Sequence, residues 1–279
     1  MIMNNSLVQR EIRRFLREDI GPGDLTTGCL PGLADRVVEA RFAAREAGTL
    51  AGLDFALEVF RALDPRVAWA GVSRRDGSTL APGEGIATVR GPAPALLTGE
   101  RTALNILQRL SGIATQARRF ASALDGSRTV LLDTRKTTPG FRYFEKYAVR
   151  VGGGHNHRLG LFDGVMIKDN HIAAVGGITE AVRCARAHAP VTVRVEVEAD
   201  TLDQVREAVE AGADIIMLDN MPPGRIAEAQ AVIAGKALVE VSGRVRLEDL
   251  PALASLGVDF ISTSAVVTRA PWLDIGLDM

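Results

Sequence analysis

The sequence predicts an α/β protein in which a parallel (β/α) barrel follows a smaller N-terminal domain. From about Val130 onward, short runs of Val, Ile and Leu alternate with amphipathic stretches, the pattern of repeated βα units. These runs show little alternation of apolar and polar residues, as expected of strands buried on both faces of a parallel sheet. A polar residue ends each run, and in (β/α) barrels such residues converge on one mouth.

The elements of the barrel half can be assigned in chain order. Strands are expected at Thr129–Leu132, Gly164–Ile167, Thr192–Val197, Asp214–Leu218, Ala237–Val241 and Phe260–Ser262. Helices are expected at Ile178–His188, Leu202–Ala211, Arg225–Ile233 and Leu247–Leu256. Thr201 and Gln204 have the spacing of a capping box, in which side chains satisfy the backbone N–H groups of a helix start. Gly212 and Gly257 follow two of these helices, where a left-handed C-cap favours glycine.

Residues 1–110 lack this rhythm, and we expect them to form a smaller α+β domain. Its predicted elements are helices at Leu7–Leu16 and Leu53–Leu63 and extended stretches at Arg36–Ala43, Val67–Ser73 and Gly85–Val89. The segment Arg75–Ser78 has the composition of a turn. A long helical pattern from Ala93 to about Leu124 leads from this domain into the barrel.

Composition and charge exclude several classes of protein. Of the 279 residues, 47% are hydrophobic and 24% are charged, which is typical of a globular chain. The 33 basic and 34 acidic side chains leave a net charge of -1, so we expect no nucleic-acid partner. Cys29 and Cys184 fit neither a disulfide framework nor a metal site. Without a signal-peptide pattern or a run of about 18 apolar residues, the chain is expected to be cytoplasmic and to bind no membrane.

Polar residues at the predicted strand ends are the first candidates for a functional site. They are Asp133, Lys168, Glu198, Asp219 and Ser242, with Thr263 or Ser264 after the last strand. A polar end is common for any one strand, but a succession of ends that carry both charge signs favours a shared site.

Cationic residues cluster around the first two of these ends. The segment Asp133–Gly140 follows a buried strand directly, Gly152–Arg158 adds a glycine triplet, and Lys168–His171 ends the next strand. The cations are Arg135, Lys136, His157, Arg158 and Lys168. Arginine offers a planar fork for carboxylate or phosphate, lysine a compact charge, and glycine lets the backbone approach a ligand. We therefore predict a site for a multiply charged anion rather than a solvated basic surface.

Carboxylates follow on the neighbouring strands. Glu196 and Glu198 stand two residues apart, so they share one face of their strand, and Asp219 ends the next strand. Carboxylates beside a polyanion site suggest a Mg²⁺ ion that bridges to phosphate, or hydrogen bonds to ribose hydroxyls. The alternative, ion pairs between these acids and the cations, stays open.

The last two strand ends are candidates for phosphate binding. Ser242-Gly243 and Thr263-Ser264 each precede a predicted helix, and the backbone N–H groups of a helix start bind phosphate. These ends also occupy the usual phosphate position of (β/α) barrels.

Segments along nearly the whole chain resemble, in the same order, the quinolinate phosphoribosyltransferase family. They are Glu18–Thr27, Gly99–Asn105, Asp133–Gly140, Glu145–Arg150, Gly152–Gly154, Asn156–Asp163, Ile167–Ile172, Val195–Glu198, Met217–Asn220 and Glu240–Gly243. Two positions depart from the family's pattern: Ser264 stands where glycine is expected, and Arg244 where Gly or Asn is commoner. Neither departure touches the predicted carboxylate-binding cations.

The resemblance implies an open TIM-type (β/α) barrel, residues 111–269, beside an N-terminal α/β sandwich domain, residues 1–110, to which the tail 270–279 returns. It implies transfer of the phosphoribosyl group of phosphoribosyl pyrophosphate to quinolinate, with Mg²⁺ as cofactor. The products would be nicotinate mononucleotide, pyrophosphate and CO₂, in de novo NAD synthesis.

The resemblance also implies roles for the candidate residues. Arg135, Lys136, His157, Arg158 and Lys168 match the family's quinolinate site, Glu198 and Asp219 its metal and ribose side, and Ser242 and Gly243 its phosphate side. Catalysis would depend on Lys136, Lys168, Glu198 and Asp219. In the family's homodimer, which could assemble further, the arginine that corresponds to Arg101 reaches into the active site of the partner subunit.

Two other functions are compatible with these residues. Lys168 at a barrel strand end could form an imine, as in a Schiff-base aldolase. The cluster could also bind a phosphorylated metabolite without turning it over. The many fixed cations and the acidic strand ends favour the phosphoribosyltransferase over both.

Overall fold

The structure, a computed structural model, describes residues 5–279 and divides into two compact units. Unit 1 comprises the described residues up to Arg118 together with Thr138–Gly152 and Ala270–Met279, and unit 2 comprises Arg119–Thr137 and Gly153–Arg269. The first four residues of the predicted domain 1–110 lie outside the described part of the chain. No helix among the described residues has the length and apolarity needed to cross a membrane.

Unit 1 is built on an antiparallel sheet with the strand order β12-β1-β5-β3. Its strands are β1 (Val37–Ala44), β3 (Ala68–Val72), β5 (Gly85–Pro92) and β12 (Ile275–Asp278), and β2 (Gly48–Thr49) and β4 (Thr79–Leu80) form a separate pair. Its helices are α1 (Asn5–Ile20), α2 (Leu25–Gly28), the 3₁₀ helix η1 (Pro31–Leu33), α3 (Leu53–Leu63), most of α4 (Ala93–Ser122) and α5 (Arg142–Val151). The last strand of the chain, β12, pairs with β1 and thus lies in the sheet of unit 1.

Helix α5 belongs to unit 1 although it follows the first barrel strand in the chain. Phe144 on α5 is fully buried, and its ring centroid lies 5.8 Å from that of Phe15 and 4.9 Å from that of Phe55. The division of the chain therefore differs from the expected ranges of 1–110 and 111–269. Contacts between distant segments leave no periodic signal, so the sequence pattern does not reveal where α5 packs.

Unit 2 contains a parallel six-stranded sheet with the order β6-β11-β10-β9-β8-β7. Its strands are β6 (Val130–Leu132), β7 (Val165–Ile167), β8 (Val195–Ala199), β9 (Ile215–Asp219), β10 (Leu238–Ser242) and β11 (Phe260–Ser262). Its helices are α6 (Asp169–Val175), α7 (Ile178–His188), α8 (Leu202–Glu210), α9 (Pro223–Ile233), η2 (Leu247–Asp249), α10 (Leu250–Ser255) and α11 (Ala265–Thr268).

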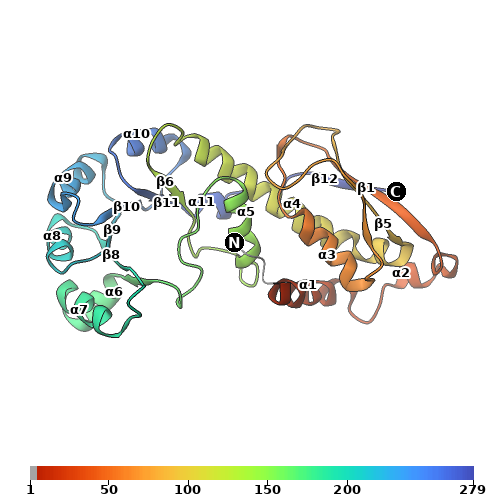
Figure 1. Ribbon diagram of the computed structural model, residues 1–279, viewed down its shortest axis with the longest axis horizontal. Helices are drawn as coiled ribbons and strands as arrows, with labels where there is room; N and C mark the ends of the chain where they lie inside the picture. Colours follow the sequence, from red (N-terminus) through yellow and green to blue (C-terminus); the bar gives the residue numbers. More distant parts are fainter. Residues whose placement is uncertain (1–4) are drawn as a thin grey trace. The chain divides into compact units, whose positions relative to one another are not determined.

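The sheet of unit 2 curves into an open barrel. Figure 1 shows β8, β9 and β10 on the inner side of an arc whose outer side carries α8, α9 and α10. Strands β6 and β7 stand at the two ends of the strand order and do not pair with each other within the described residues. The predicted open (β/α) barrel is thus confirmed.

Most local predictions agree with the structure. Helices α3 and α7 have the predicted bounds, and the capping box of Thr201 and Gln204 is formed at the start of α8. Gly212 and Gly257 have left-handed φ angles of 78° and 75°, as expected after a helix.

Several elements differ from the prediction. The expected helix Leu247–Leu256 is divided into η2 and α10, because Pro251 has no N–H group to continue the first helical turn. Strand β8 begins at Val195 rather than Thr192 and extends to Ala199. Helix α6 is absent from the prediction, since its seven residues cover too few turns to show a period.

Candidate active site

The C-terminal ends of the unit 2 strands surround a cavity of about 860 Å³, the main cavity. The predicted residues that line it are Arg135, Lys136, His157, Arg158, Lys168, Glu198, Asp219 and Ser242. A small cavity of about 250 Å³ is lined by the other candidates of this unit, Gly243, Thr263 and Ser264. Lys136, Asp219 and Ser242 line both cavities, which therefore adjoin. Parallel strands bring these residues together because their C-terminal ends meet at one edge of the sheet.

Three predicted residues do not line these cavities: Asp133, Glu196 and Arg101. Asp133 is fully buried, and its carboxylate accepts hydrogen bonds from the backbone N–H of His157 at 2.9 Å and from Nδ2 of Asn156 at 2.7 Å. It therefore fixes the loop that carries His157 and does not face the mouth. Arg101 lies on α4 in unit 1, where it is exposed, and its side chain makes no hydrogen bond or ion pair with a described residue.

Two guanidinium groups of the main cavity lie close enough for their charges to interact. Arg158 donates a hydrogen bond to the carbonyl oxygen of Gly164 at 3.2 Å. Burial lowers the pKa of Arg158, and the positive charge of Arg135 lowers it further. Like charges held together repel each other, and a bound dianion would relieve that repulsion. The pair is therefore suited to a dicarboxylate.

Lys168, which follows β7, and Glu198 on β8 form an ion pair that lines the main cavity. The alternative left open by the sequence, pairing between acids and cations, thus holds for these two residues. Asp219 at the end of β9 accepts a hydrogen bond of 2.6 Å from Nδ2 of Asn220 and has no ion-pair partner in the described chain. Mg²⁺ is usually held by one or two carboxylates plus phosphate oxygens and water, so two acids on adjacent strands fit this ion.

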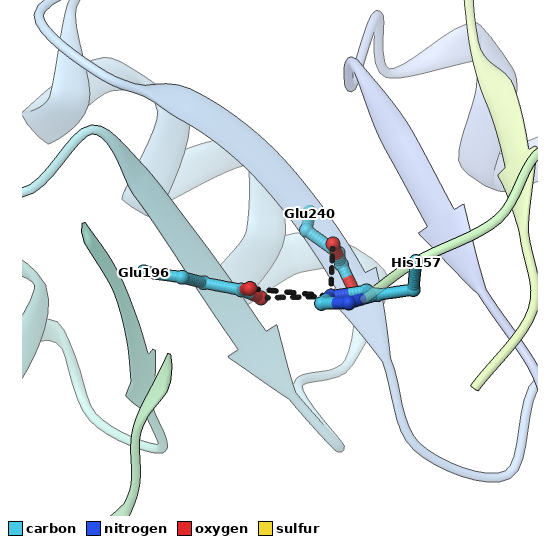
Figure 2. Close-up of side chains that lie close together, drawn as sticks. All are labelled: His157, Glu196 and Glu240. Atoms are coloured by element: carbon cyan, nitrogen blue, oxygen red, sulfur yellow. Dashed lines mark hydrogen bonds and ion pairs between the residues drawn. The ribbon is translucent and has the colours of Figure 1, made fainter. Parts of the chain in front are cut away.

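His157 stands between two buried carboxylates inside the barrel, as Figure 2 shows. Its Nε2 lies 3.1 Å from Oε2 of Glu196 on β8 and 3.5 Å from Oε2 of Glu240 on β10. Its Nδ1 accepts a hydrogen bond of 2.7 Å from the backbone N–H of Arg158. Both ring nitrogens are therefore engaged within the protein. Burial raises the pKa of the Glu196 carboxyl against the hydrogen bond from His157, and the charge of Glu240 raises it further.

Glu240 and Ser262 are residues of the site that the sequence patterns do not single out. Both are buried, and neither the carboxylate of Glu240 nor Oγ of Ser262 has a hydrogen-bond partner among the described residues. Ser262 lines both cavities. A signal for Glu240 does exist in its spacing: it stands two residues before Ser242 and so shares the same face of β10.

The loop after β10 packs closely against the loop after β9. Gly243 has a φ of 94°, and a Cβ there would come within 2.7 Å of the backbone nitrogen of Asn220, so only glycine fits. The N–H of Asn220 donates to the carbonyl oxygen of Ser242 at 3.0 Å. Asn220 and Arg244 have left-handed φ angles of 52° and 49°. These contacts give the mouth of the small cavity a fixed shape.

The small cavity offers an anion more side-chain charge than helix dipole. A loop separates β10 from η2, and α11 has only four residues, so the expected helix starts are remote or short. Lys136, Arg244 and Arg269 line the cavity, and their side chains make no hydrogen bond or ion pair within the described part of the chain. Unpaired cations around one cavity favour an anion such as phosphate.

A parallel open barrel whose strand ends carry clustered cations and opposed carboxylates defines a class of protein, the (β/α) barrel enzymes that act on multiply charged anions. Within that class, the chain belongs to the quinolinate phosphoribosyltransferase family. The models of the N-terminal and C-terminal domains of quinolinate phosphoribosyl transferase match residues 24–111 and 113–278. The resemblance seen in the sequence is thus confirmed.

Several relatives with high sequence identity are named for the same activity. The chain is 46% identical to a Bacillus subtilis (strain 168) protein named probable nicotinate-nucleotide pyrophosphorylase (carboxylating), over 99% of this chain and 95% of that protein. It is 41% identical to the nicotinate-nucleotide pyrophosphorylase (carboxylating) of Homo sapiens, over 95% of this chain and 89% of that protein. The crystal structure of NadC from Streptococcus pyogenes matches with a TM-score of 0.94 at 40% identity, covering 100% of this chain and 98% of that one.

Proposed function

We propose that this protein transfers the phosphoribosyl group of phosphoribosyl pyrophosphate to quinolinate with loss of CO₂, giving nicotinate mononucleotide and pyrophosphate in NAD biosynthesis. The observation that supports this best is the main cavity, where Arg135 and Arg158 lie together beside Lys136 and two acids. A planar diacid and a diphosphate sugar supply the negative charges that such a cavity requires. The names of the relatives point to the same reaction.

Arg135 and Arg158 are proposed to bind the two carboxylates of quinolinate and to turn its ring nitrogen toward the anomeric carbon of the sugar. Fixing the two reactants in this orientation lowers the entropic part of the barrier. We call the pair Arg135 and Arg158 the anion clamp. His157 supports this clamp from within the barrel, because its ring accepts a hydrogen bond from the backbone N–H of Arg158.

The departing pyrophosphate and the sugar ring develop opposite charges in the transition state. Lys136 and Lys168 would stabilise the negative charge of the leaving group, and the carboxylates of Glu198 and Asp219 the positive charge of the sugar. Glu198 and Asp219 would also hold Mg²⁺, which when bound neutralises phosphate charge. The 5′-phosphate of the sugar would lie in the small cavity beside Ser242, Gly243, Thr263 and Ser264. No covalent nucleophile is required.

Decarboxylation follows from the charge on the pyridine ring. The new bond between the ring nitrogen and the anomeric carbon makes the nitrogen positive. The bond from C2 to its carboxylate then breaks, and the electron pair left at C2 is stabilised by the adjacent positive nitrogen. CO₂ leaves and a proton takes its place at C2.

The experiment that tests this function incubates the protein with quinolinate, phosphoribosyl pyrophosphate and Mg²⁺. We expect nicotinate mononucleotide and CO₂ in equal amounts. Nicotinate, which lacks the second carboxylate, should react at least about 100-fold more slowly, because one guanidinium of the clamp would lose its partner. Equal rates with the two substrates would contradict the clamp.

The same assay separates the alternatives. Tight binding of quinolinate without any product would identify a metabolite-binding protein. An aldolase would be revealed by borohydride trapping of a carbonyl substrate on Lys168. The ion pair of Lys168 with Glu198 argues against this, since an imine-forming lysine must lose its charge.

We also propose that the protein is a cytoplasmic homodimer in which Arg101 of the partner subunit completes each main cavity. Arg101 suits this role because it is exposed and its side chain has no partner among the described residues of its own chain. A third guanidinium would bring further positive charge to a dianionic substrate.

Arg244→Gly is expected to weaken the binding of phosphoribosyl pyrophosphate while it stabilises the fold. A left-handed backbone costs a non-glycine residue about 1 kcal/mol, so glycine at this φ of 49° should raise Tm by about 2 °C. Loss of an unpaired cation from the small cavity should raise KM for phosphoribosyl pyrophosphate about 3- to 10-fold and leave KM for quinolinate unchanged.

Ala234→Gly is the matched control for this variant. Ala234 is exposed, has a φ of 47° at the end of α9 and lines neither cavity. The control should gain similar stability with no change in either KM. If Arg244→Gly also leaves KM for phosphoribosyl pyrophosphate unchanged, Arg244 has no part in phosphate binding.

A further inference from the structure

Glu240 is a buried carboxylate that faces His157 at the outer limit of hydrogen-bonding distance. It lies in the middle of β10 with none of its surface exposed, and neither of its oxygens accepts a hydrogen bond from a described residue. Taking a carboxylate out of water without supplying donors destabilises a fold, so packing and stability do not account for a glutamate here. The polar group beside it is Nε2 of His157, 3.5 Å from Oε2 (Figure 2).

The groups around His157 favour one tautomer of its ring. The backbone N–H of Arg158 donates to Nδ1 at 2.7 Å, so Nδ1 carries a lone pair. The ring hydrogen is then on Nε2, which faces Oε2 of Glu196 at 3.1 Å as well as Glu240. Burial opposes a charge on the ring, whereas Glu196 and Glu240 raise the pKa of His157 to about 10. The N–H that Arg158 donates at 2.7 Å leaves no room for a second hydrogen on Nδ1, so the geometry favours the Nε2–H form, with one acid from β8 and the other from β10 facing that hydrogen.

The same geometry argues against a metal ion between these three side chains, although their donor atoms lie within 4.8 Å of one another. A metal bound to Nε2 of His157 would move the ring hydrogen to Nδ1. That hydrogen would point at the N–H of Arg158, which donates to the same atom. Glu196 and Glu240 therefore interact with the ring of His157 directly and not through a metal ion.

The ring connects the sheet to the cations of the main cavity. Asp133 accepts the backbone N–H of His157, and Nδ1 of the ring accepts the N–H of Arg158, so the backbone that leads to the guanidinium is fixed twice. Arg158 stands beside Arg135, whose like charge repels it. A side chain that must stay next to a like charge depends on rigid support.

We propose that Glu240 is a positioning residue for this anion clamp: together with Glu196 it holds His157 in the Nε2–H form, and through that ring it keeps Arg158 beside Arg135. Contact between Glu240 and a substrate is not required. The inference rests on the proposed function only for the identity of the anion, quinolinate. The dependence of the clamp on Glu240 explains why this position holds a carboxylate that destabilises the fold.

The test compares Glu240→Met and Glu240→Gln in the full chain. Methionine fills the space without an acceptor, so KM for quinolinate and its dissociation constant by calorimetry should rise about 10- to 100-fold, the usual effect of losing a supporting partner. KM for phosphoribosyl pyrophosphate should change less than about threefold, since the small cavity is not involved. Glutamine keeps an oxygen acceptor for Nε2–H and should restore most of the quinolinate affinity.

Stability and NMR distinguish positioning from a merely structural role. Glu240→Met removes a buried acid that repels the carboxylate of Glu196 and accepts no hydrogen bond of normal geometry from a described residue, so its Tm should equal or exceed that of the wild type. The matched control is Glu145→Met in unit 1, where the buried acid accepts a hydrogen bond of 2.8 Å from Arg109, and there Tm should fall. Long-range ¹H–¹⁵N spectra of His157 should show the Nε2–H form in the wild type and both forms in Glu240→Met.

Three results would each overturn the proposal: wild-type affinity of Glu240→Met for quinolinate, a Tm that falls as in Glu145→Met, or a His157 that carries its hydrogen on Nδ1 in the wild type. Failure of the proposed function looks different, because the wild type itself would then form no nicotinate mononucleotide.

Discussion

Replacing Lys136 by alanine is expected to lower kcat/KM by about 30- to 1000-fold, which corresponds to about 2–4 kcal/mol of transition-state stabilisation. Lys136 is exposed at the junction of the main and small cavities, and its side chain has no hydrogen-bond or ion-pair partner within residues 5–279. Its full charge is therefore available to the phosphate groups of the substrate. Lys168, in contrast, already shares its charge with Glu198.

Lys236→Ala is the matched control for this loss. Lys236 is an exposed lysine that follows α9 and lines neither cavity, so its removal should leave kcat/KM unchanged. Neither variant should lower Tm noticeably, because exposed charges contribute little to stability. A Lys136→Ala protein with kcat/KM within about threefold of the wild type would show that the lysine does not stabilise the transition state.

The barrel could be predicted because each of its elements carries its own local signal. Strands β9 and β10 are displaced by one residue from the predicted ranges Asp214–Leu218 and Ala237–Val241. A run of apolar residues with a polar end marks such a strand wherever it packs. The place of α5 in unit 1 could not be predicted in this way, because it depends on the contact of Phe144 with Phe15, far away in the chain.

The candidate cations could be predicted for the same local reason, since most of them follow a strand. The residues with which these cations interact could not be predicted, because they depend on how the strands are arranged in the folded barrel. Glu196 and Glu240 meet at His157 from β8 and β10, two strands that are separated by β9 in the sheet. Within the sequence, Glu240 is one polar residue inside an apolar run, and only its spacing from Ser242 indicates that it faces the interior.

A mixture of two inactive variants, Arg101→Ala and Lys136→Ala, is expected to recover about a quarter of wild-type activity if the proposed dimer shares its active sites across a two-fold axis. Random exchange makes half of the dimers mixed. In a mixed dimer, one site combines the intact Lys136 of one subunit with the intact Arg101 of the partner subunit, and the other site lacks both. Activity would be measured after the mixture is unfolded and refolded together, against each variant treated alone.

The control mixes Lys136→Ala with Arg135→Ala. Both residues line the main cavity from unit 2 of the same chain, so every site in their mixed dimers lacks one of them and no activity should return. Recovery in the first mixture and none in the second would locate Arg101 on the opposite side of the subunit interface from the clamp. If neither mixture recovers, although refolded wild type does, each active site is contained within one chain. Any effect of Arg101→Ala on activity would then arise within its own subunit. Another arginine would have to supply the third guanidinium group that binds the substrate.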